Sequence, residues 1–189
     1  IDGVNTIISV STSYGTKLGL DTVSMILALL VTQIVAMPFS ILFGKLAGKF
    51  SPINLLCGAV GVYFFITVVG FFMGFIIEQN PNDPSALAMS QTLFWCMAFL
   101  VGTVQGGIQA LSRSHFGKLI PADRSNEYFG FFDIFGKFAA VIGPLLVGIF
   151  TQLTGRDSIG VISLALLFLV GEAILFGGRK TLFASKGQE

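Results

Sequence analysis

The chain has 189 residues, of which 53% are hydrophobic and only 11% are charged, and its mean hydropathy is +0.84. Soluble domains carry about 25% charged residues, so this composition excludes a soluble globular domain and a disordered chain. Two cysteines are too few for a disulfide scaffold, and a net charge of +1 gives no electrostatic footprint for a nucleic-acid partner. We therefore expect an all-α membrane protein that crosses the lipid bilayer several times.

Six segments are candidates for membrane-crossing helices, each of which needs about 20 mostly apolar residues. In chain order the predicted helices cover 1–18, 24–44, 53–77, 87–111, 127–153 and 159–178, and a tail follows over 179–189. The first segment is polar for a span, and by itself it would fit a soluble amphipathic helix. Beside five apolar segments, it is better explained as the truncated end of a span that faces the interior of the bundle.

The connections between these segments are short, as is typical of neighbouring helices. Residues 80–84, Asn-Pro-Asn-Asp-Pro, cannot continue a helix, because each proline lacks an amide hydrogen and restricts the residue before it. The longest connection, 112–126, is predicted to contain a short surface helix over 115–120 that Pro121 ends.

Basic residues are distributed unevenly between the two sides that alternate connections would occupy. One side collects eight of the eleven: Lys45, Lys49, Arg113, Lys118, Arg124, Arg179, Lys180 and Lys186. The other side has only Lys17 and Arg156, and Lys137 falls inside a predicted span. Because cytoplasmic loops carry an excess of lysine and arginine, we expect the eight-residue side and the C-terminal tail to be cytoplasmic.

Charged residues inside the predicted spans are the most informative ones, because their cost must be offset by a partner, by water or by a function. Asp133 and Lys137 are four residues apart on one helix face and can pair. The pair either neutralises itself near the cytoplasmic end or lines a cavity, where it would meet a substrate or gate access. We give these two interpretations equal weight. Glu172, two-thirds along the last segment, fits an interfacial position slightly better than a proton relay.

Uncharged polar residues also occur within the predicted spans. Gln33 lies in the middle of the second segment, and Gln105 and Gln109 are four residues apart on the fourth. Asn5 and Ser9 share one face of the first segment. Such residues more often form hydrogen bonds between helices than contacts to a ligand, yet together they outline one polar interior surface. They are therefore candidates for lining a solute cavity.

Small residues recur at every fourth position, which favours close packing of helices in lipid. Gly102, Gly106 and Ala110 show this spacing on the fourth segment. Gly143-Pro144 on the fifth segment is a candidate hinge that would bend during a transport cycle. Helix packing is the alternative and more common explanation for these residues.

The sequence lacks the constellations of side chains that enzymes use. It has no Ser/His/Asp set in a plausible site, no paired carboxylates, no phosphate-binding glycine loop ending in Lys-Ser/Thr and no His/Cys cluster. With a single histidine, His115, most metal and acid–base schemes are excluded. We therefore expect no enzymatic activity, no metal and no cofactor.

The connection after the second segment resembles a loop of the major facilitator superfamily. The run Gly44-Lys45-Leu46-Ala47-Gly48-Lys49-Phe50 is similar to the superfamily's short, basic loop that couples neighbouring helices at the cytoplasmic face, with Gly48 where an acidic residue is usual. The resemblance makes Gly44, Lys45, Gly48 and Lys49 candidates for a cytoplasmic gating loop. It also implies that six helices would form half of such a transporter.

Several longer segments resemble the vacuole-effluxer group of autophagy-related permeases. They are Asp2-Gly3-Val4-Asn5-Thr6-Ile7, Gly106-Gly107-Ile108-Gln109-Ala110-Leu111-Ser112-Arg113-Ser114, Leu119-Ile120-Pro121, Glu127-Tyr128-Phe129-Gly130-Phe131-Phe132 and Gly136-Lys137-Phe138-Ala139-Ala140-Val141-Ile142-Gly143-Pro144. Their order matches the second half of such a protein and covers essentially the whole chain. The resemblance implies the C-terminal six-helix half of a twelve-helix bundle. Bacterial members of the group make the bacterial inner membrane the expected location.

The same resemblance implies partners and site residues. The missing N-terminal six-helix half would complete a central cavity for a small solute, and fungal relatives make amino acids candidate substrates for efflux. The residues expected to face this cavity are Asp2, Asn5, Ser9, Gln105 and Gln109. Arg113 would lie at the cytoplasmic end, in the loop that links the tenth and eleventh helices. A half by itself would expose its cavity side, so we expect it to need the missing half or a second copy.

Two functions are consistent with these observations. The first is a secondary active transporter of a small solute that works by alternating access. The alternative is a non-transporting membrane scaffold or assembly partner, supported by the few intramembrane charges and the many small-residue faces. An ion channel is a weaker third option, because the sequence contains no ring of acidic residues and no filter sequence.

Overall fold

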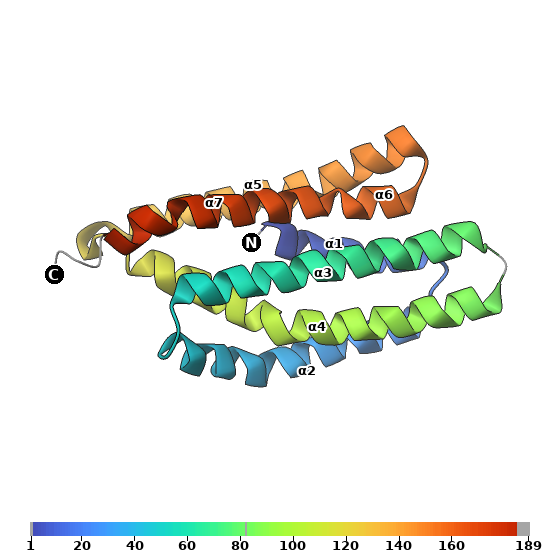
Figure 1. Ribbon diagram of the computed structural model, residues 1–189, viewed down its shortest axis with the longest axis horizontal. Coiled ribbons are helices and arrows are strands. Elements are labelled where there is room, and N and C mark those ends of the chain that lie inside the picture. Colours follow the sequence, from blue (N-terminus) through green and yellow to red (C-terminus); the bar gives the residue numbers. More distant parts are fainter. Residues whose placement is uncertain (1, 82, 185–189) are drawn as a thin grey trace.

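The chain forms a bundle of helices, and the described residues contain no strand. A computed structural model describes residues 2–81 and 83–184, apart from the side chains of residues 2, 3, 5, 122, 139 and 178–184. The elements are α1 (Asp2–Lys17), α2 (Thr22–Ala47), α3 (Pro52–Gln79), α4 (Pro84–Gly117), the 3-10 helix η1 (Ala122–Arg124), α5 (Ser125–Thr154), α6 (Asp157–Ile162) and α7 (Leu164–Ala184). In Figure 1, α2 and α4 form one side of the bundle, α5 and α7 form the other, and α1 and α3 lie between them.

Five helices of the described part are long and apolar enough to cross a membrane, which confirms the all-α membrane class. They are α2, α3, α4, α5 and the stretch Asp157–Gly177 that α6 and α7 form together. The bundle is consistent with half of a major facilitator bundle. Helix α1 has 16 residues and extends about 24 Å at 1.5 Å per residue, less than the roughly 30 Å of hydrocarbon. Its assignment as a sixth crossing stays a prediction.

The helix boundaries follow local signals in the sequence. The Asp21 carboxylate accepts a hydrogen bond from the Ser24 amide at 2.7 Å and begins α2, and Asp83 caps α4 in the same way at the Ser85 amide, at 2.9 Å. Gly155 ends α5 with φ of 68°, a left-handed conformation that glycine adopts without steric cost.

One predicted feature of the longer helices is wrong. Helix α4 continues to Gly117, so that Arg113 lies on a helix and the separate helix predicted over 115–120 does not exist. The reason is that residues 112–116 include polar side chains but neither glycine nor proline. The apolar run therefore ends before the helix does. The last predicted span is present as the stretch Asp157–Gly177. A single turn residue, Ser163, separates α6 from α7 within it, and its hydroxyl donates to the Gly160 carbonyl at 2.6 Å.

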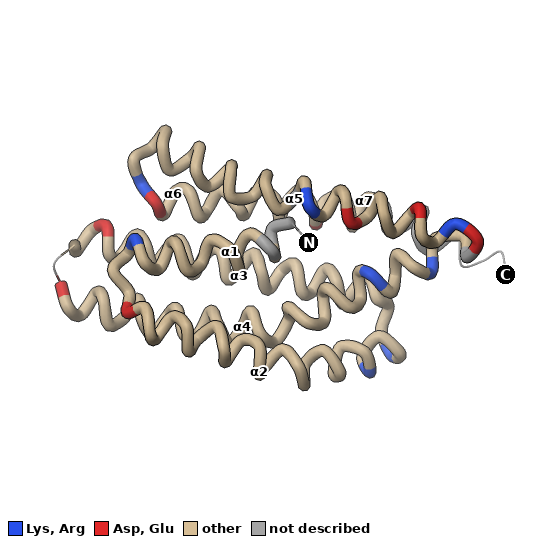
Figure 2. The backbone as a smooth tube through the Cα atoms, turned by 180° about the vertical axis from the view of Figure 1, so that it is seen from behind, with Lys and Arg blue, Asp and Glu red and all other residues tan. Residues whose placement is uncertain are grey.

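Charged residues gather at the two ends of the bundle (Figure 2). At one end, called the basic end below, the described cations are Lys45, Lys49, Arg113, Lys118 and Arg124. The opposite end, called the mixed-charge end, carries ion pairs between Lys17 and Asp157 at 2.9 Å and between Arg156 and Glu78 at 3.1 Å. The alternation of connections therefore separates the charges as expected from the sequence.

Helices α2 and α4 pack closely because glycine lets their backbones approach. A Cβ atom at Gly102 would lie 2.9 Å from the Thr32 carbonyl oxygen, and one at Gly106 would lie 3.0 Å from the Ala36 carbonyl oxygen. The predicted role of Gly102 and Gly106 in helix packing is thus confirmed. Helix α1 is fixed to α3 by the Tyr14 hydroxyl, which donates to the Gly70 carbonyl at 3.2 Å.

At the mixed-charge end, Glu78 of α3 caps the N-terminus of α6, although Glu78 and Ser158 are 80 positions apart in the sequence. Its carboxylate accepts hydrogen bonds from the Ser158 amide at 2.8 Å, from the Ser158 hydroxyl at 2.7 Å and from Arg156 Nε at 3.1 Å. No side chain of α6 itself supplies this cap. Glu78 therefore ties the start of α6 to the end of α3.

Exchanging Glu78→Gln in the full-length protein should lower the melting temperature in detergent. The amide keeps one acceptor but loses the charge, which we expect to cost about 1–2 kcal/mol. The matched control is Asp123→Asn, an exposed position on η1. Equal melting temperatures for the two variants would contradict the capping role.

Candidate solute-binding site

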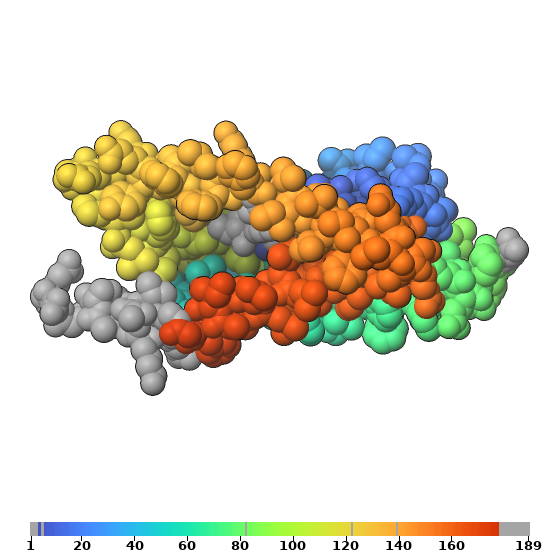
Figure 3. Space-filling view, turned by 90° about the horizontal axis from the view of Figure 1, so that it is seen from above, coloured from blue at the N-terminus to red at the C-terminus, as the bar shows by residue number. Residues whose placement is uncertain are grey.

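The predicted polar residues of the spans line three separate cavities. The largest, about 440 Å³ and called the α4–α5 cavity below, lies toward the basic end and is lined by Gln109, Ser112, Arg113, Phe132, Asp133, Gly136, Lys137 and Ala140. Within each helix these residues are one, three or four positions apart, so each helix presents one face to the cavity. Figure 3 shows α5 and α7 separating toward this end, with α4 visible between them.

The charges of the α4–α5 cavity come from both helices. Asp133 pairs with Arg113 of α4, with 3.6 Å between Nη2 and Oδ1, and the predicted pair between Asp133 and Lys137 is not formed. Arg113 of the neighbouring helix thus pairs with the Asp133 carboxylate, for which the sequence spacing had predicted Lys137 as the partner. Lys137 lines the same cavity, which leaves one positive charge in excess.

The ion pair between Arg113 and Asp133 is weak enough to be exchanged for a ligand. The two side chains are 67% and 59% exposed, and such pairs contribute about 0–1 kcal/mol to stability. A solute carrying charged groups can therefore replace either partner at little cost.

Aromatic rings close the α4–α5 cavity toward the basic end. Phe116 of α4 stacks on Phe132 of α5 with 4.8 Å between ring centroids and meets Phe129 edge-on at 5.5 Å. Because Phe132 also lines the cavity, this cluster forms one wall of the site.

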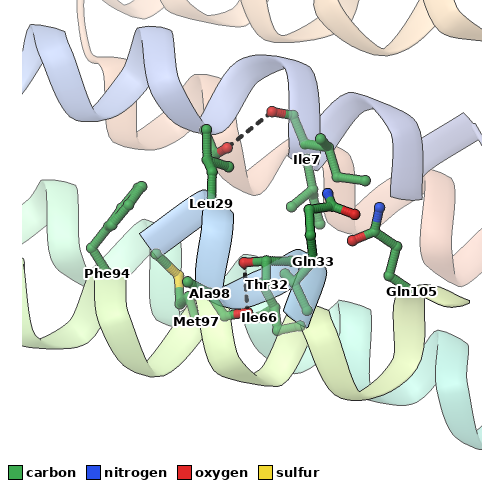
Figure 4. Close-up of a pocket in the computed structure, with 12 residues that line it drawn as sticks. Ile7, Leu29, Thr32, Gln33, Ile66, Phe94, Met97, Ala98 and Gln105 are labelled. Atoms are coloured by element: carbon green, nitrogen blue, oxygen red, sulfur yellow. Dashed lines mark hydrogen bonds between the residues drawn. The ribbon is translucent and has the colours of Figure 1, made fainter. Parts of the chain in front are cut away.

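A smaller central cavity of about 60 Å³ lies among α1, α2, α3 and α4 (Figure 4). Its walls are mostly apolar, but the side-chain amides of Gln33 and Gln105 point toward one another across one side. The Gln105 Oε1 atom is buried and has no hydrogen-bond partner among the described residues. The Thr32 hydroxyl shares its proton between the carbonyls of Ala28 at 2.9 Å and Ala98 at 3.0 Å. The cavity has room for a small group, not for a whole solute.

The third cavity, of about 390 Å³ and called the α1–α5 cavity below, lies toward the mixed-charge end. It is lined by Ser9, Val10, Ser13, Lys17, Pro144, Val147, Gly148, Thr151 and Gln152. Hydroxyl and amide groups dominate its polar lining. The one cation, Lys17, is already held by Asp157.

Comparison with known proteins decides the family of the chain. Residues 1–178 match the family described as "Vacuole effluxer Atg22 like". The chain belongs to this family. The resemblance inferred from the sequence segments is thereby confirmed.

Curated members of the effluxer family are longer than this chain. The uncharacterized MFS-type transporter YxiO of Bacillus subtilis is 47% identical over 175 residues, which cover 93% of this chain and 37% of the relative. Autophagy-related protein 22 of Eremothecium gossypii is 31% identical, with 81% of this chain and 30% of that protein covered. The Kluyveromyces lactis protein of the same name is 26% identical, with 94% and 35% covered. No solved structure matches the chain significantly.

Apart from Pro144, the remaining predicted site residues of this effluxer-family chain are outside the lining of the three cavities or have side chains outside the described residues. The side chains of Asp2 and Asn5 are outside the described residues. Of the loop candidates, Gly44 and Lys45 lie in the last turn of α2, and Gly48 and Lys49 lie in the connection between α2 and α3 at the basic end. All four are outside the lining of the three cavities.

Gly143 and Pro144 lie inside α5, which continues through both residues without a break. Gly143 is buried against Thr6 of α1, whereas Pro144 lines the α1–α5 cavity. Their role as a hinge stays a prediction.

Sequence reasoning missed several lining residues of α5, among them Ala140, Gly148 and Thr151. The signal was present, because steps of three and four residues from Asp133 reach each of these positions on one helix face. Ala140, Gly148 and Thr151 have small, uncharged side chains, which in a single sequence do not indicate a solute-binding site. Glu172 of α7, whose Oε2 atom is buried without a hydrogen-bond partner among the described residues, lines none of the three cavities.

Proposed function

We propose that the full-length protein is a secondary transporter that moves a small solute across the membrane by alternating access, and that this chain supplies its C-terminal half. The observation that carries the proposal is the α4–α5 cavity, in which Arg113, Asp133 and Lys137 place three charges toward the end of a membrane bundle. Charges within spanning segments are expensive and typically mark a solute or ion path.

The charges of the cavity suit an amino acid. Arg113 and Lys137 can receive a carboxylate, and Asp133 can receive an ammonium group, in charge-assisted hydrogen bonds. Gln105 and Gln109 are four residues apart on α4, about 6 Å along the axis. They would link the charged cavity to the largely apolar central cavity, which offers a place for part of an apolar side chain.

The least buried helices are the ones that a second half would cover. In the most apolar 18-residue stretch of each helix, only 11% of the residues of α2 and 6% of those of α5 are buried within the chain. Large apolar side chains such as Met37 of α2 and Phe135 of α5 are exposed. These faces would contact lipid and the N-terminal half of the transporter.

The charge separation supports an orientation for transport. Because cytoplasmic connections carry an excess of lysine and arginine, the basic end and the α4–α5 cavity would face the cytoplasm. A bacterial inner membrane is the expected location, and solute loaded at the basic end would leave at the mixed-charge end.

Reconstitution of the full-length protein in liposomes tests the function. Vesicles preloaded with one unlabelled amino acid should accumulate the same radiolabelled amino acid by counterflow, for at least one member of a panel of the twenty. Empty liposomes are the control. Absence of counterflow for every amino acid, with folded protein present in the vesicles, would overturn the amino-acid proposal. The same result with a panel of other small anions and zwitterions would favour the scaffold alternative.

A further inference from the structure

A continuous face of α5 connects the α4–α5 cavity with the α1–α5 cavity. Asp133, Lys137 and Ala140 line the α4–α5 cavity, and Pro144, Gly148 and Thr151 line the α1–α5 cavity. These residues follow one another at steps of three to four, so they form one stripe along the helix. The opposite face of α5 carries exposed large apolar side chains, including Phe135 and Ile142. The helix thus presents a stripe of mostly small or polar residues from Asp133 to Thr151.

Between the two cavities, α1 packs against α5 at Gly143, which lies beside the stripe. Gly143 lies between Ala140 of the first cavity and Pro144 of the second, and the fully buried Thr6 side chain packs directly on it. A Cβ atom at position 143 would overlap the Thr6 hydroxyl oxygen and would lie 2.6 Å from the Thr6 Cβ. The backbone of α5 and the side chain of Thr6 therefore leave no space between them.

The two glycines of α5 that line the cavities do not make such a contact. A Cβ atom at Gly136 or at Gly148 would meet nothing within 4 Å. Gly136 borders the α4–α5 cavity and Gly148 borders the α1–α5 cavity. Helix α5 is thus open to a cavity at Gly136 and at Gly148 and is in close contact with Thr6 at Gly143 between them.

We propose that the α1–α5 cavity is a second solute-binding site beside the α4–α5 cavity, and that Thr6 and Gly143 form the barrier between the two sites. This inference rests on the proposed transport function. This second site binds the same small polar solute, which it contacts through hydroxyl and amide groups of Ser9, Ser13, Thr151 and Gln152. Its cation, Lys17, is held by Asp157 at 2.9 Å, so a charged solute binds there more weakly than beside Arg113 and Lys137. Weaker binding at the mixed-charge end favours release on that side.

Cysteine labelling tests the barrier without reference to any solute. In the full-length protein with all native cysteines replaced by serine, Ala140→Cys and Thr151→Cys each place one thiol in one cavity. A membrane-impermeant maleimide is applied to one face of sealed vesicles. We expect Ala140→Cys to react from the face of the basic end and Thr151→Cys from the opposite face, each with a preference of about ten-fold, because the labelling rate follows the accessible fraction.

Changing the barrier should change the sidedness of labelling. Thr6→Gly removes the side chain that fills the contact, and labelling of Thr151→Cys from the basic-end face should rise about five-fold. Adding Gly143→Ala to Thr6→Gly puts a methyl group into the same space and should return labelling close to its original level. Gly130→Ala on the same helix is the matched control, since a Cβ atom there meets nothing within 4 Å. It should leave labelling unchanged.

Equal labelling of either introduced cysteine from both faces in the presence of Thr6 and Gly143 would overturn the barrier, as would an unchanged pattern with Thr6→Gly. If Thr6→Gly yields no folded protein by gel filtration, Thr6→Ser replaces it. That variant should raise labelling about two-fold, and no rise would again overturn the proposal. A protein that shows one-sided labelling but no counterflow would contradict the transport function and leave the barrier in place.

Discussion

Replacing Asp133 by alanine in the full-length protein should reduce the initial rate of amino-acid counterflow about ten-fold or more, because a hydrogen bond to a charged group contributes roughly 1.5–3 kcal/mol. Among the described residues, the substitution removes the only carboxylate that lines the α4–α5 cavity. Arg113 and Lys137 would then lack an acidic neighbour there, and an ammonium group of the solute would lack an acceptor. The melting temperature should change little, because the Asp133 side chain is 59% exposed and its ion pair contributes little to stability.

Two further variants make this prediction specific. Glu127→Ala removes another acidic residue from the first turn of α5, at an exposed position outside the three cavities, and should leave counterflow unchanged. The double exchange Arg113→Asp with Asp133→Arg keeps the pair but reverses it, and should recover part of the lost rate. An equal loss of rate with Glu127→Ala, or a loss of folded protein with Asp133→Ala, would indicate a structural role instead.

The largest effect on stability is expected from Gly102→Leu. A side chain at this position would enter the contact between α4 and α2, where even a Cβ atom lies 2.9 Å from both the Thr32 carbonyl oxygen and the Val35 Cβ. Backbone cannot move aside as a flexible side chain can, so the helices must separate. Overpacking costs about 1–3 kcal/mol or more, and we expect a marked fall in melting temperature in detergent and a lower yield of monodisperse protein.

The control for this prediction places the same side chain where there is space. Gly61→Leu is on α3, another membrane-crossing helix, and a Cβ atom there meets nothing within 4 Å. Both variants add the same apolar volume, so hydropathy and insertion into the membrane are matched. If both variants lower the melting temperature equally, the close approach of α2 and α4 is not what stabilises the bundle.

Membrane class and helix order could be predicted from the sequence because they depend on local composition. A helix in lipid satisfies all its backbone hydrogen bonds internally, so an apolar run of sufficient length already specifies a crossing. The ends of α4 show the limit of this reasoning. The apolar run ends at Ser112, but no helix-breaking residue follows directly and α4 continues to Gly117. Arg113 therefore lies on a helix and not in a loop.

The pairing of charges was not predictable in the same way. Sequence spacing gave Asp133 a partner four residues away on its own helix, Lys137, because only intrahelical neighbours are visible in a single sequence. The structure pairs Asp133 with Arg113, which is 20 positions earlier in the chain and on another helix. Which helices are neighbours depends on packing, and packing in lipid depends on the fit of small residues.

Composition, the apolar runs and the distribution of lysine and arginine thus determined by themselves that the chain is a helical membrane bundle with a basic end. These properties arise from the bilayer as a solvent, which acts on each segment separately. Only the tertiary structure decided which polar residues share a cavity, that Glu78 caps α6, and that Thr6 meets Gly143 between two cavities. The Glu78–Ser158 and Thr6–Gly143 contacts join residues 80 and 137 positions apart. Such contacts depend on how the helices pack rather than on any local property of the chain.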